Sequence, residues 1–541
     1  MSFQSPEFAG FLAIALLFYY IVPQKLRKWV LLLENAAFFL WVDLSAGIWL
    51  GLSIVSTWVA ALLCQNTARR KTGKKEEEDR DGKSVRASWC GRLMLIGCLI
   101  CNLGLLACFQ YLPVWDRLIN AAYGQGLRVV HLDPAGRLGL VAPVGISFYT
   151  LQAAGYLLDV YRGKYEPEKN LAKYAIFVSF FPNLASGPIE RGDHFLPQLE
   201  QVLQAKRRSL LDYDRMAQGL ISVLYGFFLK MVIADRAGIL VDHLYGMYEF
   251  GNSFTMLCAM LFYSVQIYCD FASYSCIATG IAQMMGFTLA DNFRQPYFAV
   301  GISDFWRRWH ISLSGWLKDY VYIPMGGNRR GVLRRYQNLL AVFLVSGLWH
   351  GGAPQFLVWG FGHGLCQVAE DLCRRLVRAC RFAGRKRDGQ KASAEDGQHV
   401  RRSLMRRAGK ICGGVWRWFA RLCTFFTVSL LWIFFRSDSV DMAMVCIRNL
   451  FTGWQGFFYW KEFLFAMGLD RVQMLLLLAF VGVLLLLDGI SERTKKRTCR
   501  WIYEARLPLR WGICLGLLLS VFLFGQYGPG FDASGFIYAN F

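Results

Sequence analysis

Two histidines forty positions apart carry the side chains best suited to chemistry in this chain. His310 lies in the segment Asp304-Phe-Trp-Arg-Arg-Trp-His-Ile-Ser-Leu-Ser314, and His350 lies in Leu348-Trp-His-Gly-Gly352. Each histidine directly follows a tryptophan. Imidazole changes its charge near neutral pH, so both residues are candidates for proton transfer in a reaction. The arginine-rich hinge between them then runs into an apolar helix, a combination that is unusual for a membrane segment.

The depth of His350 follows from helix geometry. A helix from Asn338 to His350 climbs roughly 18 Å at about 1.5 Å per residue, which is past the middle of a hydrocarbon core of about 30 Å. Gly351, Gly352 and Pro354 then break the helix. An ionisable residue placed there is a functional-site hypothesis. The alternative is a neutral histidine that hydrogen-bonds a neighbouring carbonyl.

The hinge supplies cations close to the first histidine. Residues 303–318 are predicted to form an amphipathic helix with Trp306, His310 and Ser314 on one face at i, i+4 spacing. Many interfacial helices rich in Trp and Arg are only membrane anchors.

A substrate that enters from the predicted cytoplasmic side meets three cations before His350. They are Arg307, Arg308 and Lys318. Asn328 follows two glycines, which form either a plain turn or a place where the backbone approaches a ligand.

Polar residues within the apolar runs are further candidates. Asp270 can orient a histidine or line a polar cavity, but it can equally cap a kinked helix or pair with Lys230. His363 is expected to make a structural hydrogen bond. The full set is Gln152, Asp159, Lys230, Gln266, Asp270 and His363.

Composition determines the class of protein that must position these residues. The 541 residues are 55% hydrophobic and 16% aromatic with positive mean hydropathy, which predicts an all-α polytopic integral membrane protein. Residues 8–22 are expected to be a retained first span, and 174–186 a re-entrant half-helix. The remaining apolar runs are 29–42, 46–64, 93–112, 139–160, 216–235, 254–287, 338–350, 355–372, 416–435, 472–490 and 510–527.

The distribution of charge orients these runs. With the N-terminus outside, the predicted cytoplasmic loops hold 49 Lys and Arg, whereas the opposite loops at 113–138, 236–253 and 436–471 hold 8. The net charge of +22 is therefore topological, and nucleic-acid binding loses its main support. Both termini are expected to be extracytoplasmic. The hydrophilic segments 65–92 and 373–411 are predicted cytoplasmic loops of a single membrane domain over 1–541.

The cysteines do not predict a metal site. Most of the sixteen lie within apolar runs, and no cluster combines cysteine and histidine at zinc spacing. They are most simply small apolar residues. Cys98 and Cys101 are spaced as a CxxC pair, but inside a hydrophobic run this is weak support for redox chemistry.

At this level of detail the chain resembles the bacterial branch of the membrane-bound O-acyltransferase family, which includes alginate O-acetylation proteins and the D-alanyl-transfer protein of teichoic-acid modification. The segments around both histidines carry the resemblance. It extends to residues 143–150, 159–163, 180–188, 270–274, 291–293, 319–328 and 535–538. Segments 65–92 and 373–411 have no match.

The resemblance implies a ring of about 10–12 transmembrane helices, with re-entrant and interfacial helices, around a central buried histidine. His350 takes the place of the family's invariant histidine and His310 that of a second one. Arg307, Arg308, Lys318 and Asn328 are then donor-binding candidates. Asp270, Asp304, Trp306 and Trp349 are supporting residues.

The implied reaction moves an acyl group, acetyl above all, from a cytoplasmic thioester across a cell membrane to an extracytoplasmic polysaccharide or a partner transferase. The donor is an acyl-coenzyme A or an acyl carrier protein, with no tightly bound cofactor. D-alanyl transfer to teichoic acid is the alternative within the family. A transporter or flippase that relays ions through His350, Asp270 and Lys230 is the alternative of another class.

Overall fold

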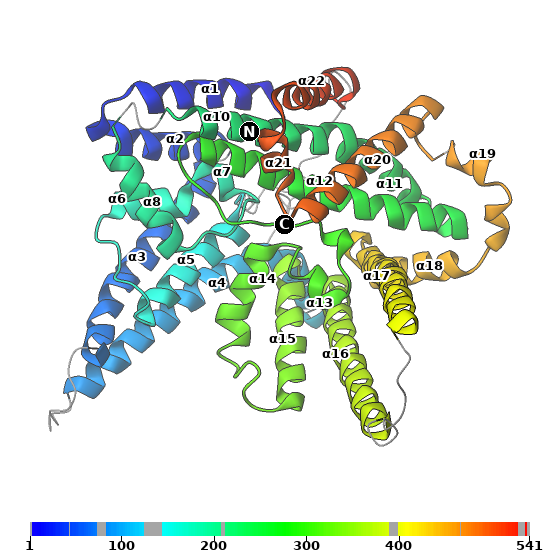
Figure 1. The fold of residues 1–541 in the computed structure, drawn as a ribbon. Helices are drawn as coiled ribbons and strands as arrows, with labels where there is room; N and C mark the ends of the chain where they lie inside the picture. Colours follow the sequence, from blue (N-terminus) through cyan, green and yellow to red (C-terminus); the bar gives the residue numbers. More distant parts are fainter. Residues whose placement is uncertain are drawn as a thin grey trace.

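The computed structural model describes residues 3–42, 44–72, 83–123, 143–206, 211–388, 399–465, 467–527 and 536–537. Within these residues the regular structure is helical, which confirms the all-α prediction (Figure 1). The first half of the chain forms α1 (Pro6–Ile21), α2 (Arg27–Val42), α3 (Leu44–Thr72), α4 (Lys83–Tyr123), α5 (Ile146–Tyr161), α6 (Leu171–Ser179), α7 (Phe181–Leu184), α8 (Gly192–Gln204), α10 (Tyr213–Phe227), α11 (Asp235–Gly246) and α12 (Ser253–Met284).

The second half carries both histidines. Its helices are α13 (Ile302–Phe305), α14 (Ile311–Leu317), α15 (Val332–His350), α16 (Pro354–Asp388), α17 (His399–Arg436), α18 (Val440–Phe451), α19 (Trp460–Leu464), α20 (Arg471–Thr494), α21 (Thr498–Glu504) and α22 (Leu507–Phe524). The described parts of the hydrophilic segments 65–92 and 373–411 belong to α3, α4, α16 and α17. Residues 73–82 and 389–398 lie outside the described ranges.

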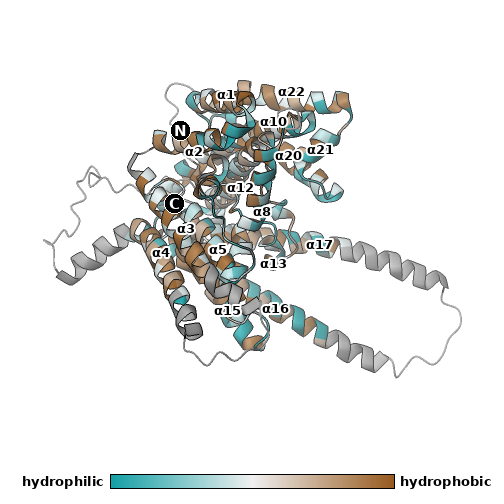
Figure 2. Cartoon of the chain, turned by 90° about the vertical axis from the view of Figure 1, so that its left-hand side faces the viewer, coloured by the Kyte–Doolittle hydropathy of each residue, from teal (hydrophilic) through white to brown (hydrophobic). Residues whose placement is uncertain are grey.

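Seven helical segments in the described ranges are long and apolar enough to cross a membrane. They are Ala46–Cys64, Gly91–Tyr111, Tyr213–Gly246, Ser253–Met284, Gly414–Arg436, Arg471–Thr494 and Leu507–Phe524. α1 is apolar but shorter. Hydrophobic residues line the outer helices α1, α3, α4 and α22, where Ile14 on α1 and Phe522 on α22 are 57% and 66% exposed (Figure 2). Such a surface suits contact with lipid.

The segment 174–186 is broken as expected. α6 ends at Ser179, and the single turn α7 follows it before the chain continues to α8. The broken backbone is buried in protein, because Phe181 donates its N–H to Asn35 Oδ1 at 3.0 Å. A re-entrant or half-helix therefore describes this segment better than a span.

The helix that follows is longer than its apolar run. Residues 236–246 were expected to be a loop, but α10, a π-helical segment at Phe228–Ala234 and α11 form one continuous helix. Asp235 and Arg236 were predicted to mark the polar end of a span, but both side chains are buried. Asp235 pairs with Lys230 at 2.8 Å, so the charge that suggested a helix end is neutralised inside the protein.

α12 crosses the middle of the molecule beneath α10 (Figure 1). The two helices pack closely because both carry glycine at their crossing: a Cβ added to Gly219 would lie 2.7 Å from the carbonyl oxygen of Gly280. Most of α12 is buried. Residues of α12 therefore contact the buried charge cluster, the ring of His310 and a cavity of about 990 Å³.

A buried charge cluster ties both described ends of the chain to α12. Lys230 Nζ lies 2.7 Å from Asp270 Oδ1, and its ammonium lies 4.7 Å from the centre of the Phe536 ring. Gln4 donates to Asp235 at 3.0 Å, and the backbone N–H of Ile537 donates to Asp270 Oδ2 at 2.8 Å. Of the alternatives for Asp270, pairing with Lys230 is confirmed. The two described ends of the chain therefore meet at this cluster.

Candidate active site

The hinge that carries His310 is interrupted at the histidine itself. α13 ends at Phe305, and α14 begins at Ile311. His310 has φ +43° and ψ +54°, a left-handed conformation that few non-glycine residues adopt. The expectation of one amphipathic helix over 303–318 is therefore wrong, and Trp306, His310 and Ser314 do not share a helix face.

Asn292 holds His310 in this conformation. Asn292 Oδ1 lies 3.1 Å from His310 Nδ1 and accepts from the Ser312 hydroxyl at 2.8 Å, and the Asn292 carbonyl accepts from Ile311 N–H at 3.0 Å. The Asn292 amide N–H₂ donates to Ser275 Oγ on α12 at 3.1 Å. Because an amide oxygen only accepts, Nδ1 must carry the proton of a neutral His310. The Nε2 lone pair is then the basic position.

His350 is the last residue of α15, as the glycine pair after it predicted, and it is 2% exposed. α15 and α16 form a tight hairpin, because a Cβ at Gly347 would lie 2.4 Å from the carbonyl oxygen of Phe356. Carbonyl groups at a helix end need partners from outside the helix. Here α4 supplies them, since Gln110 donates to the Trp349 carbonyl and Tyr111 to the Leu348 carbonyl.

The cytoplasmic end of this hairpin, in the predicted topology, is held by an ion-pair network. Asp371 on α16 accepts hydrogen bonds from Arg375 at 2.7 Å, Tyr336 at 2.8 Å and Arg335 at 3.0 Å. Burial alone would raise the pKa of Asp371, but these hydrogen bonds lower it to about 2. The network holds α15 and α16 together at the end of the hairpin that is distant from His350.

The two histidines meet at the ring of Trp349. The ring centres of His350 and Trp349 lie 4.8 Å apart, and those of His310 and Trp349 lie 5.9 Å apart. Trp359 and Phe435 approach His350 within 5.0 and 5.2 Å, and Phe271 approaches His310 within 4.7 Å. Electrostatic interactions are stronger in such an apolar surrounding than in water.

His363 and Trp306 form a separate pair beside this centre. Trp306 Nε1 donates to His363 Nδ1 at 3.2 Å, and both side chains are buried. The expected structural hydrogen bond of His363 is thus present. Trp306 supports His363 and does not contact the ring of His350 directly. Trp359 contacts the rings of both His350 and His363.

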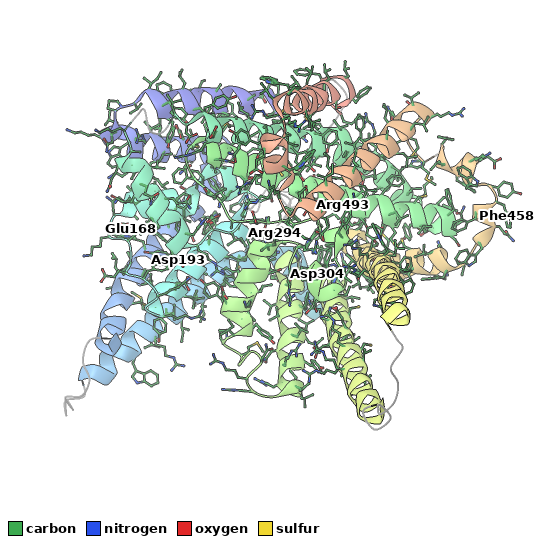
Figure 3. All side chains as sticks on the ribbon, in the orientation of Figure 1. Glu168, Asp193, Arg294, Asp304, Phe458 and Arg493 are labelled. Atoms are coloured by element: carbon green, nitrogen blue, oxygen red, sulfur yellow. The ribbon has the colours of Figure 1, made fainter. Side chains whose placement is uncertain are left out.

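A cavity of about 990 Å³ reaches Asn292, the residue that holds His310. We call it the donor cavity, because the donor-binding candidates Arg307 and Arg308 line it. α10, α12, the segment 287–295, the hinge and α20–α21 form its wall, and Asn292, Ser275 and Tyr268 line its inner part. Figure 3 shows Arg294 and Asp304 at the middle of the molecule, and both belong to this wall. Its cations are Arg294, Arg307, Arg308, Lys495, Lys496, Arg497 and Arg500.

Arg307 and Arg308 both line the donor cavity, but only one is engaged in ion pairs. Arg308 lies 3.1 Å from Asp304 and 2.8 Å from Glu492. Burial would lower the pKa of Arg308, but its hydrogen bonds to Glu492 and Asp304 raise it. Arg307 is exposed, and the ion pairs found among the described residues do not include it. Of the two, Arg307 is therefore the better candidate for a phosphate contact.

Lys318 and Asn328 do not join the donor cavity. Lys318 borders a smaller apolar cavity of about 190 Å³ between the hinge, α15 and α16. Asn328 is exposed and accepts a hydrogen bond from Tyr322, beside Gly326 and Gly327 with φ +105° and +52°. Both residues follow the helix break at His310, and neither lines the cavity that Arg307 lines.

Three contributors were missed in the sequence. Asn292 stood in a recognisable block without an assigned role, and Gln110 and Tyr111 appeared only as the polar end of an apolar run. Their partners lie far away in the chain, so local patterns carry little signal for them. Asp270 neighbours Phe271, which contacts His310, although its own carboxylate faces Lys230.

Comparison with known proteins gives the same family as the motifs. Residues 168–392 match the sequence model of the membrane-bound O-acyltransferase family. Probable alginate O-acetylases of Pseudomonas syringae pv. tomato and Pseudomonas putida are 36% and 35% identical over 66% of this chain, which aligns with 64% and 68% of their lengths. The teichoic acid D-alanyltransferase of Bacillus subtilis is 30% identical over 42% of this chain and 58% of its own length. The chain thus spans about two thirds of the alginate relatives.

Proposed function

The chain belongs to the membrane-bound O-acyltransferase family, and we propose that it passes an acetyl group from a cytoplasmic thioester donor toward an extracytoplasmic polysaccharide or a partner transferase. One observation supports this most strongly: two buried histidines share the ring of Trp349, and the residue that orients one of them lines a cavity of about 990 Å³ with cations in its wall.

The proposed chemistry is direct acyl transfer to a hydroxyl group. His350 takes the proton as the hydroxyl oxygen attacks the thioester carbonyl, the new ester bond forms, and the carbon–sulfur bond breaks. The proton then goes to the leaving thiolate. His310, with its proton on Nδ1, presents Nε2 to the same centre as a second base or hydrogen-bonding group.

The donor cavity suits a thioester on a long phosphate-bearing arm. Arg307 provides an exposed guanidinium for phosphate. Serine, asparagine and tyrosine side chains deeper in the wall suit the polar groups of such an arm, namely Ser222, Ser275, Asn292, Tyr225 and Tyr268. An acyl-coenzyme A and an acylated carrier protein share this chemistry.

Acetyl transfer is favoured over D-alanyl transfer by the extent of similarity. The alginate relatives align over 66% of this chain, and the teichoic acid D-alanyltransferase over 42% at lower identity. The transporter alternative needs Lys230 and Asp270 to exchange ions. In the structure these side chains pair with each other, and their cluster is hydrogen-bonded to Gln4 and Ile537 at the two described ends of the chain.

The test is acyl transfer by the purified full chain in lipid nanodiscs. Labelled acetyl-coenzyme A and a labelled acetyl carrier protein are supplied separately, and release of the donor thiol is followed together with label on added alginate. We expect thiol release that depends on His350. The absence of release with both donors, from protein that is monodisperse and thermally stable, would overturn the proposal.

A further inference from the structure

A buried loop between α7 and α8 contacts the segment that holds His310. Residues 185–191 form this loop, which we call the clamp loop, and within it Ile189 and Glu190 are only 3% and 1% exposed. The loop lies tightly against α7, because a Cβ added to Gly187 would be 2.3 Å from the Cα of Asn183. The clamp loop is therefore fixed well enough to hold other segments in place.

The side chain of Glu190 connects the clamp loop to the wall of the donor cavity. One carboxyl oxygen accepts a hydrogen bond from the backbone N–H of Ala290, and the other lies 2.8 Å from Nδ1 of His194 on α8. Burying an acidic side chain is costly unless its oxygens are hydrogen-bonded, and here both have partners. Ala290 precedes Asn292 by two residues, and both line the donor cavity. Glu190 thereby holds the backbone that carries Asn292.

The neighbouring residue Ile189 reaches the side chain of Asn292 by a second path. The N–H of Ile189 donates to the Ser312 hydroxyl at 3.1 Å, and that hydroxyl donates to Asn292 Oδ1 at 2.8 Å. The same oxygen lies 3.1 Å from His310 Nδ1. Two consecutive residues of the clamp loop thus support Asn292, one through its backbone and one through its side chain.

α8 anchors the start of the same segment. Gln198 donates to the carbonyl of Thr288 at 3.1 Å and accepts from the N–H of Thr288 at 2.7 Å. The ring of Phe195 stacks on that of Phe287, with centres 5.0 Å apart and planes inclined by 6°. Because Gln198 is only half-buried, its hydrogen bonds can be removed with little effect on the core.

We propose that Glu190 is a positioning residue for acyl transfer, which acts through Asn292 on His310. This inference rests on the proposed function. Without the carboxyl oxygen of Glu190, the N–H of Ala290 loses its partner and Asn292 is free to shift. A small displacement of a group that takes part in the reaction lowers the rate strongly, because the reacting atoms must be held in the correct geometry. Loss of Glu190 should therefore lower kcat more than donor affinity.

The first experiment compares E190A and E190Q in the full chain in nanodiscs, with donor thiol release as the assay. E190A should lower kcat by about tenfold with the donor KM within about twofold of native. E190Q should recover most of the loss, because its amide oxygen can still accept from Ala290. E200A is the matched control, since Glu200 on α8 pairs with Lys173 on α6, and it should keep native kcat. Equal kcat of E190A and native protein would overturn the proposal.

A double-mutant cycle tests whether Glu190 acts through Asn292. E190A is measured in the native chain and in N292L, where the amide oxygen that holds His310 is already missing. The factor lost on introducing E190A should shrink from about tenfold to near one, because residues that act on the same group are not additive. The same factor in both backgrounds would show that Glu190 acts independently of Asn292.

Hydrogen exchange gives a readout that does not depend on activity. A peptide covering residues 287–294, followed by mass spectrometry, should exchange faster in E190A than in native protein or E200A. Q198A loosens the same segment from a half-buried position, so it should also speed exchange, with a smaller loss of kcat, and it replaces E190A if that variant does not fold. Unchanged exchange would overturn the positioning role. Failure of the proposed function looks different, because native protein would then release no donor thiol while exchange still responded to E190A.

Discussion

His310 places its Nδ1 atom 3.1 Å from the Oδ1 atom of Asn292, and the same oxygen accepts from Ser312. The amide thereby selects one tautomer of the imidazole and holds the left-handed turn at His310. This relationship connects the donor cavity to the histidine pair, because Asn292 faces both.

Removing the amide acceptor should lower turnover more than donor affinity. N292L leaves the buried Nδ1–H without its partner, which typically costs about 1–3 kcal/mol, or about 5- to 150-fold in rate if the loss appears in the transition state. Steady-state kinetics with varied donor concentration measure the split between kcat and KM. If N292L lowered only the yield of folded protein and left kcat normal, Asn292 would have a purely structural role.

N292D tests the protonation state of His310 directly. A carboxylate stabilises the charged imidazolium and so raises the pKa of His310. If the neutral form is needed, activity is lost as the pH falls through the raised pKa, and the pH–rate profile moves to higher pH. A profile that coincides with that of the native protein would contradict a role of His310 in proton transfer.

Replacing His350 should remove catalysis and leave the fold intact. General-base catalysis contributes about 10²–10⁴-fold, so H350A and H350Q should both lose transfer by about that factor while donor binding persists. Glutamine can hydrogen-bond but cannot take a proton at neutral pH. H363Q is the matched control, because it keeps an acceptor for Trp306, and its loss should be smaller. Near-normal turnover by H350Q would exclude His350 as the base.

The two hinge arginines should behave differently. R307Q removes an exposed cation of the donor cavity and should raise the donor KM with a smaller change in kcat, because phosphate is bound before the chemical step. R308Q removes the guanidinium that pairs with both Asp304 and Glu492 and should lower thermal stability. Equal donor affinity of R307Q and native protein would reassign Arg307 as a membrane anchor.

Breaking the buried charge cluster should destabilise the whole protein. K230M leaves Asp235 and Asp270 uncompensated and should cost about 3–5 kcal/mol, visible as a lower unfolding temperature in detergent. R436M is the control, since its partner Asp242 is 62% exposed and such pairs contribute about 0–1 kcal/mol. A stable K230M protein with altered ion flux would revive the transporter alternative.

Thiol labelling can test the orientation. F458C lies in an exposed segment between α18 and α19 (Figure 3), where Phe458 is 84% exposed, and R378C lies on the exposed polar part of α16. With accessible native cysteines removed, intact cells should label F458C and not R378C with an impermeant maleimide. The reverse pattern would invert the topology drawn from the 49 to 8 charge asymmetry.

The class, family and helix end at His350 were determined by the sequence, because each depends on local chemistry. Long apolar runs require helices in lipid, and Gly351-Gly352 followed by Pro354 ends a helix wherever it packs. The motif blocks around His310 and His350 identified the family without any knowledge of their contacts.

The partners of the site residues were decided only by the tertiary structure. In the sequence Arg308 is equivalent to Arg307, but in the structure Arg308 donates to Glu492, which lies 184 positions away. Lys318 was predicted to lie with both arginines, but it borders another cavity beyond the left-handed break at His310, which Asn292 holds. A prediction from periodicity assumes a continuous helix. Side-chain hydrogen bonds between distant segments can interrupt that helix, because they offset the backbone strain of a single left-handed residue.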